Sequence, residues 1–408
     1  MNTVKIAVII ALTGLPILAS AGTIQAPISV SAMAQAGAVT AAPGMSGYAV
    51  NPAAIGFLHG STFSADAFNV NPQFKYASGG GGNASVLADG FITHHFHQSP
   101  WSVGFSVTMP DVINAKWPSI IHVPPQPLYG PNFTFPPMNL AGNASVVDFS
   151  PTISYQIFHN LSAGIGLDYY QTLGSAFSSP LPGPTVGMQS AWGAGHGIGG
   201  TFGLQYVIGT WQFGADYKTG ANVKLSRSSL FMGFYMPNQI NIPGNWQAGI
   251  GYQVKKSLHL EADFTRTNWS QFWLLTVPRM NYQNSDSYAL GVRWSTATPT
   301  IGSPSPWTET VLKWLPDPYL PSIPITIMGG FRHSTNPATQ ATDAIDSFQF
   351  GGNTASLGIS FKLSHWRATV GGAYQLPTTG PSQSKFFGPS AGVTTSNMQV
   401  GISLTRHF

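Results

Sequence analysis

Apolar and polar side chains alternate along most of the chain. From Trp101 to Met109 every second residue is apolar, and only Ser, Gly and Thr lie between them. Residues 147–157 and 161–169 show nearly the same period, with His159-Asn160 between them. A period of two places alternate side chains on opposite faces of a β-strand. Each segment therefore predicts a strand, and the last two predict a hairpin with one apolar face.

The same layout recurs up to the C-terminus. Further alternating pairs turn at Gly209-Thr210, at residues 255–257 and near His365, whereas the segments between pairs are long and rich in Pro, Gly and aromatic residues. With two weaker strands, at 61–76 and 84–97, the count is about fourteen, an even number as in single-chain bacterial barrels. We therefore predict an all-β fold, a transmembrane antiparallel β-barrel with tight turns at one end and long loops at the other.

Composition separates this barrel from a soluble β-sandwich, whose strands alternate in the same way. Charged residues are only 7% of the chain and aromatic residues 12%, whereas a soluble domain carries about 25% charged residues. The hydrophobic share of 43% argues against disorder. The formal charge of +4 is not gathered in a basic run, which argues against a nucleic-acid partner. In lipid a sheet must close on itself so that every backbone N–H and C=O has a partner.

The N-terminus has the pattern of a secretory signal peptide. Lys5 precedes an apolar run over 6–19, and Ala19-Ser20-Ala21 matches the small residues of a cleavage site. We expect residues 1–21 to be removed, with cleavage after Ala26 as the alternative. A retained anchor is the weaker interpretation, because the run is too short for a comfortable spanning helix. Since the chain lacks cysteine, we expect its stability to come from a large or closed sheet instead of disulfides.

Tryptophans lie near many predicted strand ends, where they would anchor the two membrane interfaces. They are Trp101, Trp211, Trp246, Trp269, Trp294 and Trp366. Residues 296–322 interrupt this layout where a tight turn is expected, and Thr308 to Trp314 could form a short helix there.

The inward face carries the few charges of the predicted strands. They are Asp148, Asp168, Asp216, Lys218, Glu261, Asp263, Arg293 and Lys362. Since buried charges are normally paired, we expect pairing across neighbouring strands, for example of Asp263 with Arg293. A specific ion or sugar site is the alternative.

The loops at the long-loop end are unusually apolar, as in the stretch "LFMGFYMPNQI" and in 110–142. A contiguous apolar patch on a surface marks a binding site, and Met with aromatic residues adapts to flexible apolar ligands. These loops either bind a hydrophobic ligand or plug the mouth, and the two roles are compatible. The substrate-binding candidates are Phe177, Leu181, Met188, Trp192, Leu230, Phe231, Met232, Phe234, Tyr235 and Met236.

No constellation of residues indicates catalysis. His94, His95 and His97 are clustered, but no Cys or carboxylate lies close to them in sequence, so we predict no metal site. No Gly-x-Ser-x-Gly motif is present. We expect no catalytic residues and no cofactor.

Two stretches carry a resemblance to a known family. "SVSAMAQAGAVTAAPGMSGYAVNPAAIGFLHG" places Asn51, Pro52 and Ala53 after an Ala/Gly-rich segment and before the first strand, and "IPGNWQAGIGYQVKKSLHLEADFTRTNWSQF" spans 242–272. Taken in order, they resemble the FadL/TodX family of outer-membrane transporters of long-chain fatty acids and aromatic hydrocarbons. Two departures are Arg406 in the last strand and the scarcity of basic residues in the apolar loops, where Arg227 is the one Lys or Arg within 173–200 and 226–243. That scarcity favours a neutral hydrocarbon over a fatty acid.

This resemblance implies a specific route for the ligand. An N-terminal hatch, residues 22–60 including Asn51, Pro52 and Ala53, would lie inside a barrel formed by 61–408. Ligand would be captured in a groove between the loops at 173–200 and 226–243, pass the hatch and leave sideways through the wall. The opening would come from a kink in the third strand, 101–110, where Gly104 or Pro110 could interrupt the ladder.

The sequence thus predicts passive transport of hydrophobic compounds across the outer membrane of a Gram-negative bacterium. Expected partners are the hydrophobic ligand, outer-membrane lipid, lipopolysaccharide and the barrel assembly machinery, and the chain is expected to be a monomer. A general porin for small polar solutes is the alternative, and an outer-membrane enzyme such as a phospholipase is a third possibility.

Overall fold

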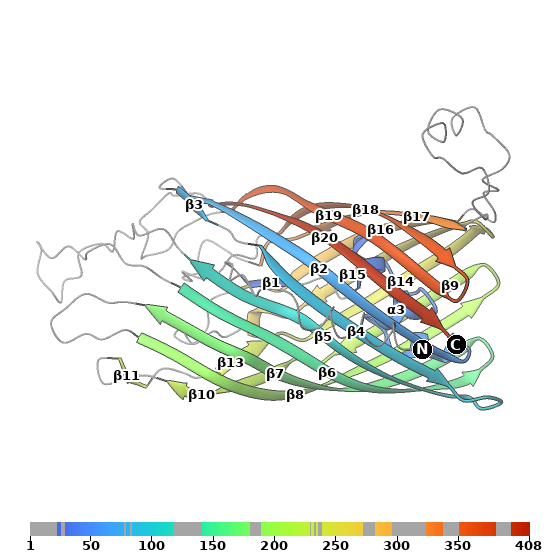
Figure 1. Cartoon of the computed structure of the whole chain (residues 1–408), viewed down its shortest axis with the longest axis horizontal. Coiled ribbons are helices and arrows are strands. Elements are labelled where there is room, and N and C mark those ends of the chain that lie inside the picture. Colours follow the sequence, from blue (N-terminus) through green and yellow to red (C-terminus); the bar gives the residue numbers. More distant parts are fainter. Residues whose placement is uncertain are drawn as a thin grey trace, which may run out of the picture.

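The wall of the molecule is an antiparallel sheet that closes into a barrel (Figure 1). The computed structural model describes residues 23–25, 29–76, 79–81, 84–116, 141–179, 189–228, 230–231, 234–235, 239–271, 282–295, 324–337, 351–380 and 393–408. The expected signal peptide, 1–21, and the insertion 296–322 lie outside this set.

Each wall strand pairs with its neighbours in the sequence. The strands are β2 (Ser61–Tyr76), β4 (Ser85–His95), β5 (Trp101–Lys116), β6 (Ala141–Phe158), β7 (Leu161–Ser179), β8 (Gln189–Ile208), β9 (Trp211–Lys218), β10 (Ala221–Ser228), β13 (Gln239–Ile242), β14 (Asn245–Lys255), β15 (Leu258–Thr267), β16 (Ser285–Ser295), β17 (Ile325–Ser334), β18 (Gly352–Leu363), β19 (Trp366–Gly380) and β20 (Val393–His407). β8 pairs with both β9 and β10, which occupy one position in the wall, and β13 and β14 pair with them in turn. The described residues thus form fourteen wall positions, as the sequence predicts.

Closure comes from the pairing of the first and last wall strands. β2 and β20 are in register from Thr62↔His407 to Lys75↔Thr394. The first and last wall strands are therefore not left as free edges, which lipid could not pair.

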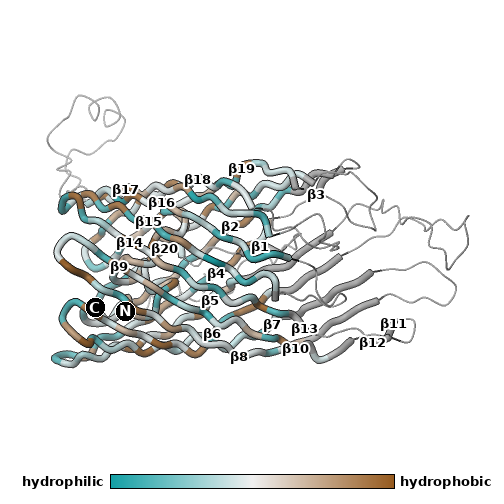
Figure 2. Tube along the Cα trace, turned by 180° about the vertical axis from the view of Figure 1, so that it is seen from behind, coloured by the Kyte–Doolittle hydropathy of each residue, from teal (hydrophilic) through white to brown (hydrophobic). Residues whose placement is uncertain are grey.

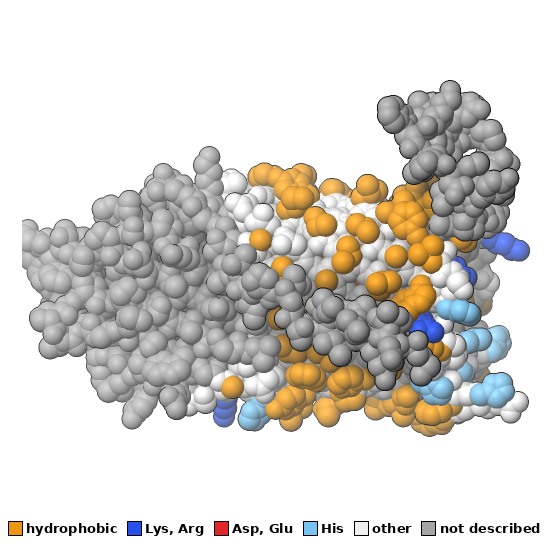
Figure 3. Space-filling view, viewed as in Figure 1, with side chains coloured by type: hydrophobic (Ala, Val, Ile, Leu, Met, Phe, Trp, Pro, Cys, Tyr) orange, Lys and Arg blue, Asp and Glu red, His pale blue; other side chains and the backbone are white. Residues whose placement is uncertain are grey.

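The alternation in the sequence becomes an apolar outer face and a polar inner face. In β18 Leu357 points outward and is 66% exposed, while its inward neighbour Gly358 is buried. Figure 3 shows the resulting apolar side chains on one face of the wall, and Figure 2 shows the mixed hydropathy along the strands from the opposite side. Exposed apolar side chains on this scale fit a surface that faces lipid.

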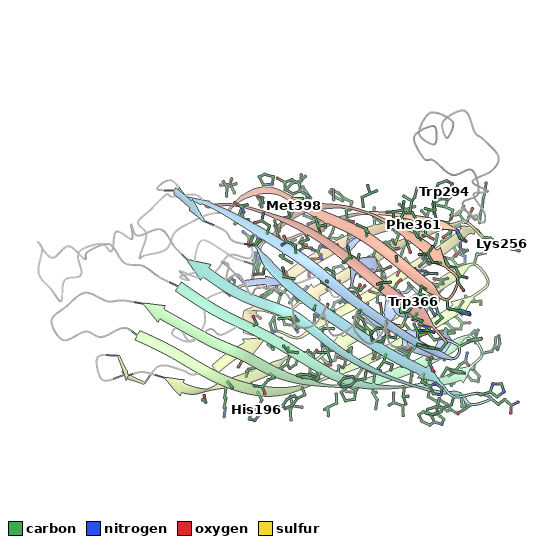
Figure 4. The ribbon with its side chains drawn as sticks, in the orientation of Figure 1. His196, Lys256, Trp294, Phe361, Trp366 and Met398 are labelled. Carbon is green, nitrogen blue, oxygen red and sulfur yellow. The ribbon has the colours of Figure 1, made fainter. Side chains whose placement is uncertain are left out.

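The short turns gather at the end of the barrel that holds the C-terminus (Figure 1). His159-Asn160, Gly209-Thr210, 256–257 and 364–365 are turns of two residues, close to the predicted positions. Figure 4 places Trp294, Phe361 and Trp366 near this end. The expectation for Trp269 is wrong: it lies in a short 3₁₀ helix (Trp269–Gln271), is only 5% exposed and packs against Tyr282 instead of facing the membrane.

The N-terminal part of the chain packs against the inner face of the barrel. Residues 29–58, here called the luminal segment, contain the helices α2 (Val30–Met33) and α3 (Met45–Tyr48) and the 3₁₀ helix η1 (Pro52–Phe57). Most of their side chains are buried, and η1 contacts β6, β7 and β8 while α2 contacts β19 and β20. Figure 1 shows these helices enclosed by the strands. Before this segment, β1 (Thr23–Gln25) pairs with residues 111–113 of β5.

Three short strands complete the fold. β3 (Gly79–Gly81) extends the pairing of β2, and β11 (Leu230–Phe231) pairs with β12 (Phe234–Tyr235) in a separate hairpin. Among the described residues, no helix is long and apolar enough to cross a membrane.

Candidate functional site

The Asn-Pro-Ala turn is a junction between the luminal segment and the wall. The Asn51 side-chain amide donates to the carbonyl of Thr40 (3.1 Å) and to that of Leu204 in β8 (3.0 Å), and its oxygen accepts from the Ala53 N–H (3.0 Å). Pro52 begins η1, where a missing N–H is harmless because the first turn has no partner for it. Asn51 is fully buried, so these bonds satisfy polar groups that water does not reach.

Carboxylates of the inner wall hold a second stretch of the luminal segment. Asp263 on β15 accepts the N–H groups of Val39 (2.9 Å) and Thr40 (2.8 Å), and Glu261 accepts that of Ala41 (2.6 Å). Three consecutive backbone donors are thus satisfied from one strand. A buried N–H group without an acceptor costs about 1–3 kcal/mol, so this contact is a main attachment of the segment.

These contacts correct the expected pairing of Asp263 with Arg293. Among the described residues that ion pair is absent, because Asp263 points at the luminal backbone. Lys218 does pair with inward carboxylates, at 2.9 Å from Asp148 and 4.0 Å from Asp168. These contacts join β9 to β6 and β7, which are not its neighbours in the wall, so they differ from the predicted pairing across neighbouring strands.

Glycines on the inner face leave room for the luminal segment. A Cβ on Gly164 would lie 2.5 Å from the carbonyl carbon of Pro52, and one on Gly203 would overlap the Asn51 side chain. A Cβ on Gly330 would likewise overlap the backbone of Gln35. Distances under 3 Å are not tolerated between such atoms. The luminal segment therefore fills the space beside these inward glycines, so they do not simply widen the lumen.

The wall is interrupted between β4 and β5. Their ladder runs from His95↔Ser102 to Gly90↔Val107, and no further pair forms between the described residues of the two strands. We call this point the wall break. Next to it β5 carries one extra residue relative to β6, because Thr108 pairs with Asp148 and Asp111 with Val146. The N–H of Met109 bonds to the Asp89 side chain (2.8 Å) instead of to a strand.

A buried apolar cluster, here called the break cluster, lies beside the wall break. It joins α2 of the luminal segment to β2, β4 and β19, and Met109 packs against it. Its members are Val30, Met33, Phe68, Val70, Leu87 and Ala373. This arrangement places apolar side chains, the luminal segment and the interrupted wall at one point.

The two residues expected to open the third strand have different environments. Pro110 lies in the bulge between Thr108 and Asp111. Gly104 lies in the continuous ladder, paired with Thr93 and Thr152, and a Cβ there would lie 2.5 Å from the Tyr48 hydroxyl. Burial of Tyr48 in α3 raises the pKa of its phenol to about 12, so the ring stays neutral. Gly104 therefore makes room for the luminal segment, whereas the irregularity lies at Met109-Pro110.

The candidate loop residues are only partly described. Backbone pairing joins Leu230 to Tyr235 and Phe231 to Phe234. The backbones of Phe177 and Trp192 belong to β7 and β8. Leu181, Met188, Met232 and Met236 lie outside the described residues.

Several residues of this site were not singled out from the sequence. Tyr48, Asp66 and Asp89 belong to it, and Gln205 donates to the carbonyl of Ala41 (2.5 Å). In the sequence, the one signal for Asp66 and Asp89 is that each falls at an inward-facing position of a predicted strand. No group of three or more His, Asp or Glu side chains in the described part could hold a metal ion.

A closed barrel with an apolar outer face and a buried N-terminal segment defines an outer-membrane type of β-barrel. No family model and no curated protein match the sequence. Solved structures match over nearly its whole length. A FadL homologue of Pseudomonas aeruginosa aligns with a TM-score of 0.68 at 14% identity and covers 96% of this chain and 99% of its own.

Two hydrocarbon transporters align as well. The P. putida toluene transporter TodX has a TM-score of 0.62 at 13% identity and covers 93% of this chain and 98% of its own. The Ralstonia pickettii toluene transporter TbuX has a TM-score of 0.57 at 15% identity with the same coverage. The chain thus has the fold of FadL and TodX, and the resemblance inferred from its sequence is confirmed at that level.

Proposed function

We propose that the protein is a passive channel that carries hydrophobic compounds, long-chain fatty acids or hydrocarbons, across the outer membrane. The observation that carries this proposal is the wall break with its adjoining break cluster. A polar solute would gain nothing from a side opening lined by Val, Leu and Phe. An apolar ligand gains about 25 cal/mol for each Å² that it removes from water.

The proposed route begins at the apolar loops and ends in the bilayer. Ligand is captured by the loops around Phe231 and Phe234, moves past the luminal segment and leaves through the wall break. The luminal segment then acts as a hatch, with 22–60 as its extent and 1–21 as the signal peptide. The fold shared with transporters of toluene supports this route, and no chemistry on the ligand is required.

Uptake of labelled oleate and labelled toluene by cells with and without the gene tests the proposal. We expect the gene to increase uptake of at least one of them at low ligand concentration. If neither changes while liposomes carrying the protein become permeable to sugars, the protein is a porin for polar solutes. Release of fatty acid from phospholipid by the purified protein would identify an enzyme instead.

A further inference from the structure

Two carboxyl groups lie directly opposite each other beside the wall break. Asp66 on β2 pairs with Asp89 on β4 in the ladder. Both side chains point inward, and each residue is 5% exposed. Side chains at directly opposite positions of an antiparallel pair have their Cβ atoms about 4.5–5.5 Å apart. The two carboxyl groups are therefore close neighbours away from bulk water.

Each carboxyl group holds a different part of the proposed exit. Asp66 Oδ1 accepts the N–H of Val30 (3.1 Å), the first residue of α2 in the luminal segment. Asp89 Oδ1 accepts the N–H of Met109 (2.8 Å), which lies in the bulge of β5. The pair thus connects the luminal segment to the irregular strand through two adjacent side chains.

The surroundings offer no cation to balance two negative charges. Ser64 on β2 contacts Asp66 and lies beside Ser403 and Thr405 of β20, and the break cluster borders the pair through Phe68 and Leu87. α2 and β5 contribute backbone N–H groups. Among the described residues, no Lys, Arg or His forms an ion pair with either carboxylate.

We propose that Asp66 and Asp89 share one proton and together position the luminal segment and the β5 bulge. Two buried carboxylates at directly opposite ladder positions cannot both ionise without strong repulsion, so the pair keeps one proton between them. In that state both backbone N–H groups have an acceptor. Loss of the shared proton at alkaline pH creates repulsion, which is relieved when one side chain withdraws and releases α2 or Met109. This inference rests on the proposed function in one respect: the pair controls the exit of a ligand only if the protein transports one.

Infrared spectroscopy of the purified protein tests the shared proton. At neutral pH we expect the double variant, Asp66→Asn with Asp89→Asn, to lose the carbonyl band of one protonated carboxyl group and the band of one ionised carboxylate relative to the wild type. Each single variant should lose one of these two bands. Loss of two protonated bands, or of two ionised bands, in the double variant would overturn the proposal.

A second measurement tests the positioning role. Because the chain lacks cysteine, Met33→Cys reports the exposure of the break cluster to a thiol reagent. We compare the rate of thiol labelling in Met33→Cys alone with that in Met33→Cys combined with Asp66→Asn. From neutral to alkaline pH, we expect the rate in the first protein to rise about tenfold more than in the second, because the loss of one hydrogen bond to a charged group changes the opening equilibrium by about that factor. The thiol titrates in both proteins, so its own effect on the rate cancels. A constant ratio between the backgrounds would rule out the positioning role.

Neither measurement depends on transport, and the folding of each variant is checked separately. Asn keeps an oxygen that can accept from Val30 or Met109, and the shift in gel mobility on heating verifies that each barrel is folded. Neither readout uses a transported ligand. Failure of this inference therefore leaves the proposed transport intact, and failure of uptake leaves the proton pair intact.

Discussion

Single residues of the inner surface decide how tightly the luminal segment is held. Asn51 satisfies three backbone groups with one side chain. Gly104 contributes by having no side chain, because Tyr48 occupies the space that a Cβ would take. A buried amide and an absent Cβ thus serve the same packing, one by bonding and the other by leaving room.

Replacement of Asn51 by Ala should loosen the segment without opening the barrel. Each backbone group left unpaired costs about 1–3 kcal/mol, and three are affected. We expect larger and noisier conductance in planar lipid bilayers. Asn69→Ala, at an exposed position of β2, is the control for removing an amide that makes no bond to the luminal segment, and its conductance should match that of the wild type. Equal conductance in all three proteins would contradict this role of Asn51.

Replacement of Gly104 by Ala should displace Tyr48 from the wall. The added methyl would lie 2.5 Å from the hydroxyl and 2.8 Å from the ring carbon that bears it. We expect Tyr48 to become accessible to iodination in the folded barrel. Gly90→Ala is the control, because no atom lies within 4 Å of a Cβ there. Unchanged protection of Tyr48 in Gly104→Ala would show that the neighbouring strands yield instead.

At the scale of elements, the important feature is one extra residue in β5. Because Thr108 and Asp111 are three residues apart while their partners Asp148 and Val146 are two apart, β5 bulges away from a regular ladder. Bulges of this kind bend a strand and interrupt pairing. The wall break with β4 begins at the same level.

Deletion of Pro110 should therefore close the proposed exit. Without the extra residue β5 can continue in register with β6, and it can pair further along β4 once β1 leaves residues 111–113 of β5. We expect uptake of toluene or oleate to fall to the level of cells without the gene, while the protein still reaches the membrane as a heat-modifiable barrel. Pro110→Ala keeps the residue count and should retain most uptake. Full uptake by the deletion variant would exclude the wall break as the route.

At the scale of the whole molecule, the barrel is a rigid frame around a segment that touches most of it. The luminal segment bonds to β2, β8, β15 and β18, so its position depends on the closed sheet and not on its short helices. In the proposed route, the apolar loops at the far end capture the ligand, and capture and exit are separate steps.

Removing aromatic area from the loops should weaken capture alone. We expect Phe231→Ala with Phe234→Ala to lower uptake at low ligand concentration and to leave uptake at high concentration nearly unchanged, because less apolar area is buried on binding. Phe202→Ala with Phe331→Ala, on the outer wall of β8 and β17, is the control for a general effect on the barrel. Equal loss in both pairs would argue against the loops as the capture site.

The sequence by itself determined the barrel, since alternation is a local pattern and each hairpin joins neighbours. The family resemblance pointed further, to a hatch at Asn51-Pro52-Ala53 and to an interruption of the third strand at Gly104 or Pro110. Only the tertiary structure decided that Asp263 bonds to the luminal backbone, that Gly104 faces Tyr48 and that Asp66 lies opposite Asp89. These contacts join residues far apart in the chain: Asn51 and Leu204 are 153 residues apart, and Ala34 and Ser356 are 322 apart. No period in the sequence encodes such pairs, because they exist only once the sheet has closed around the segment.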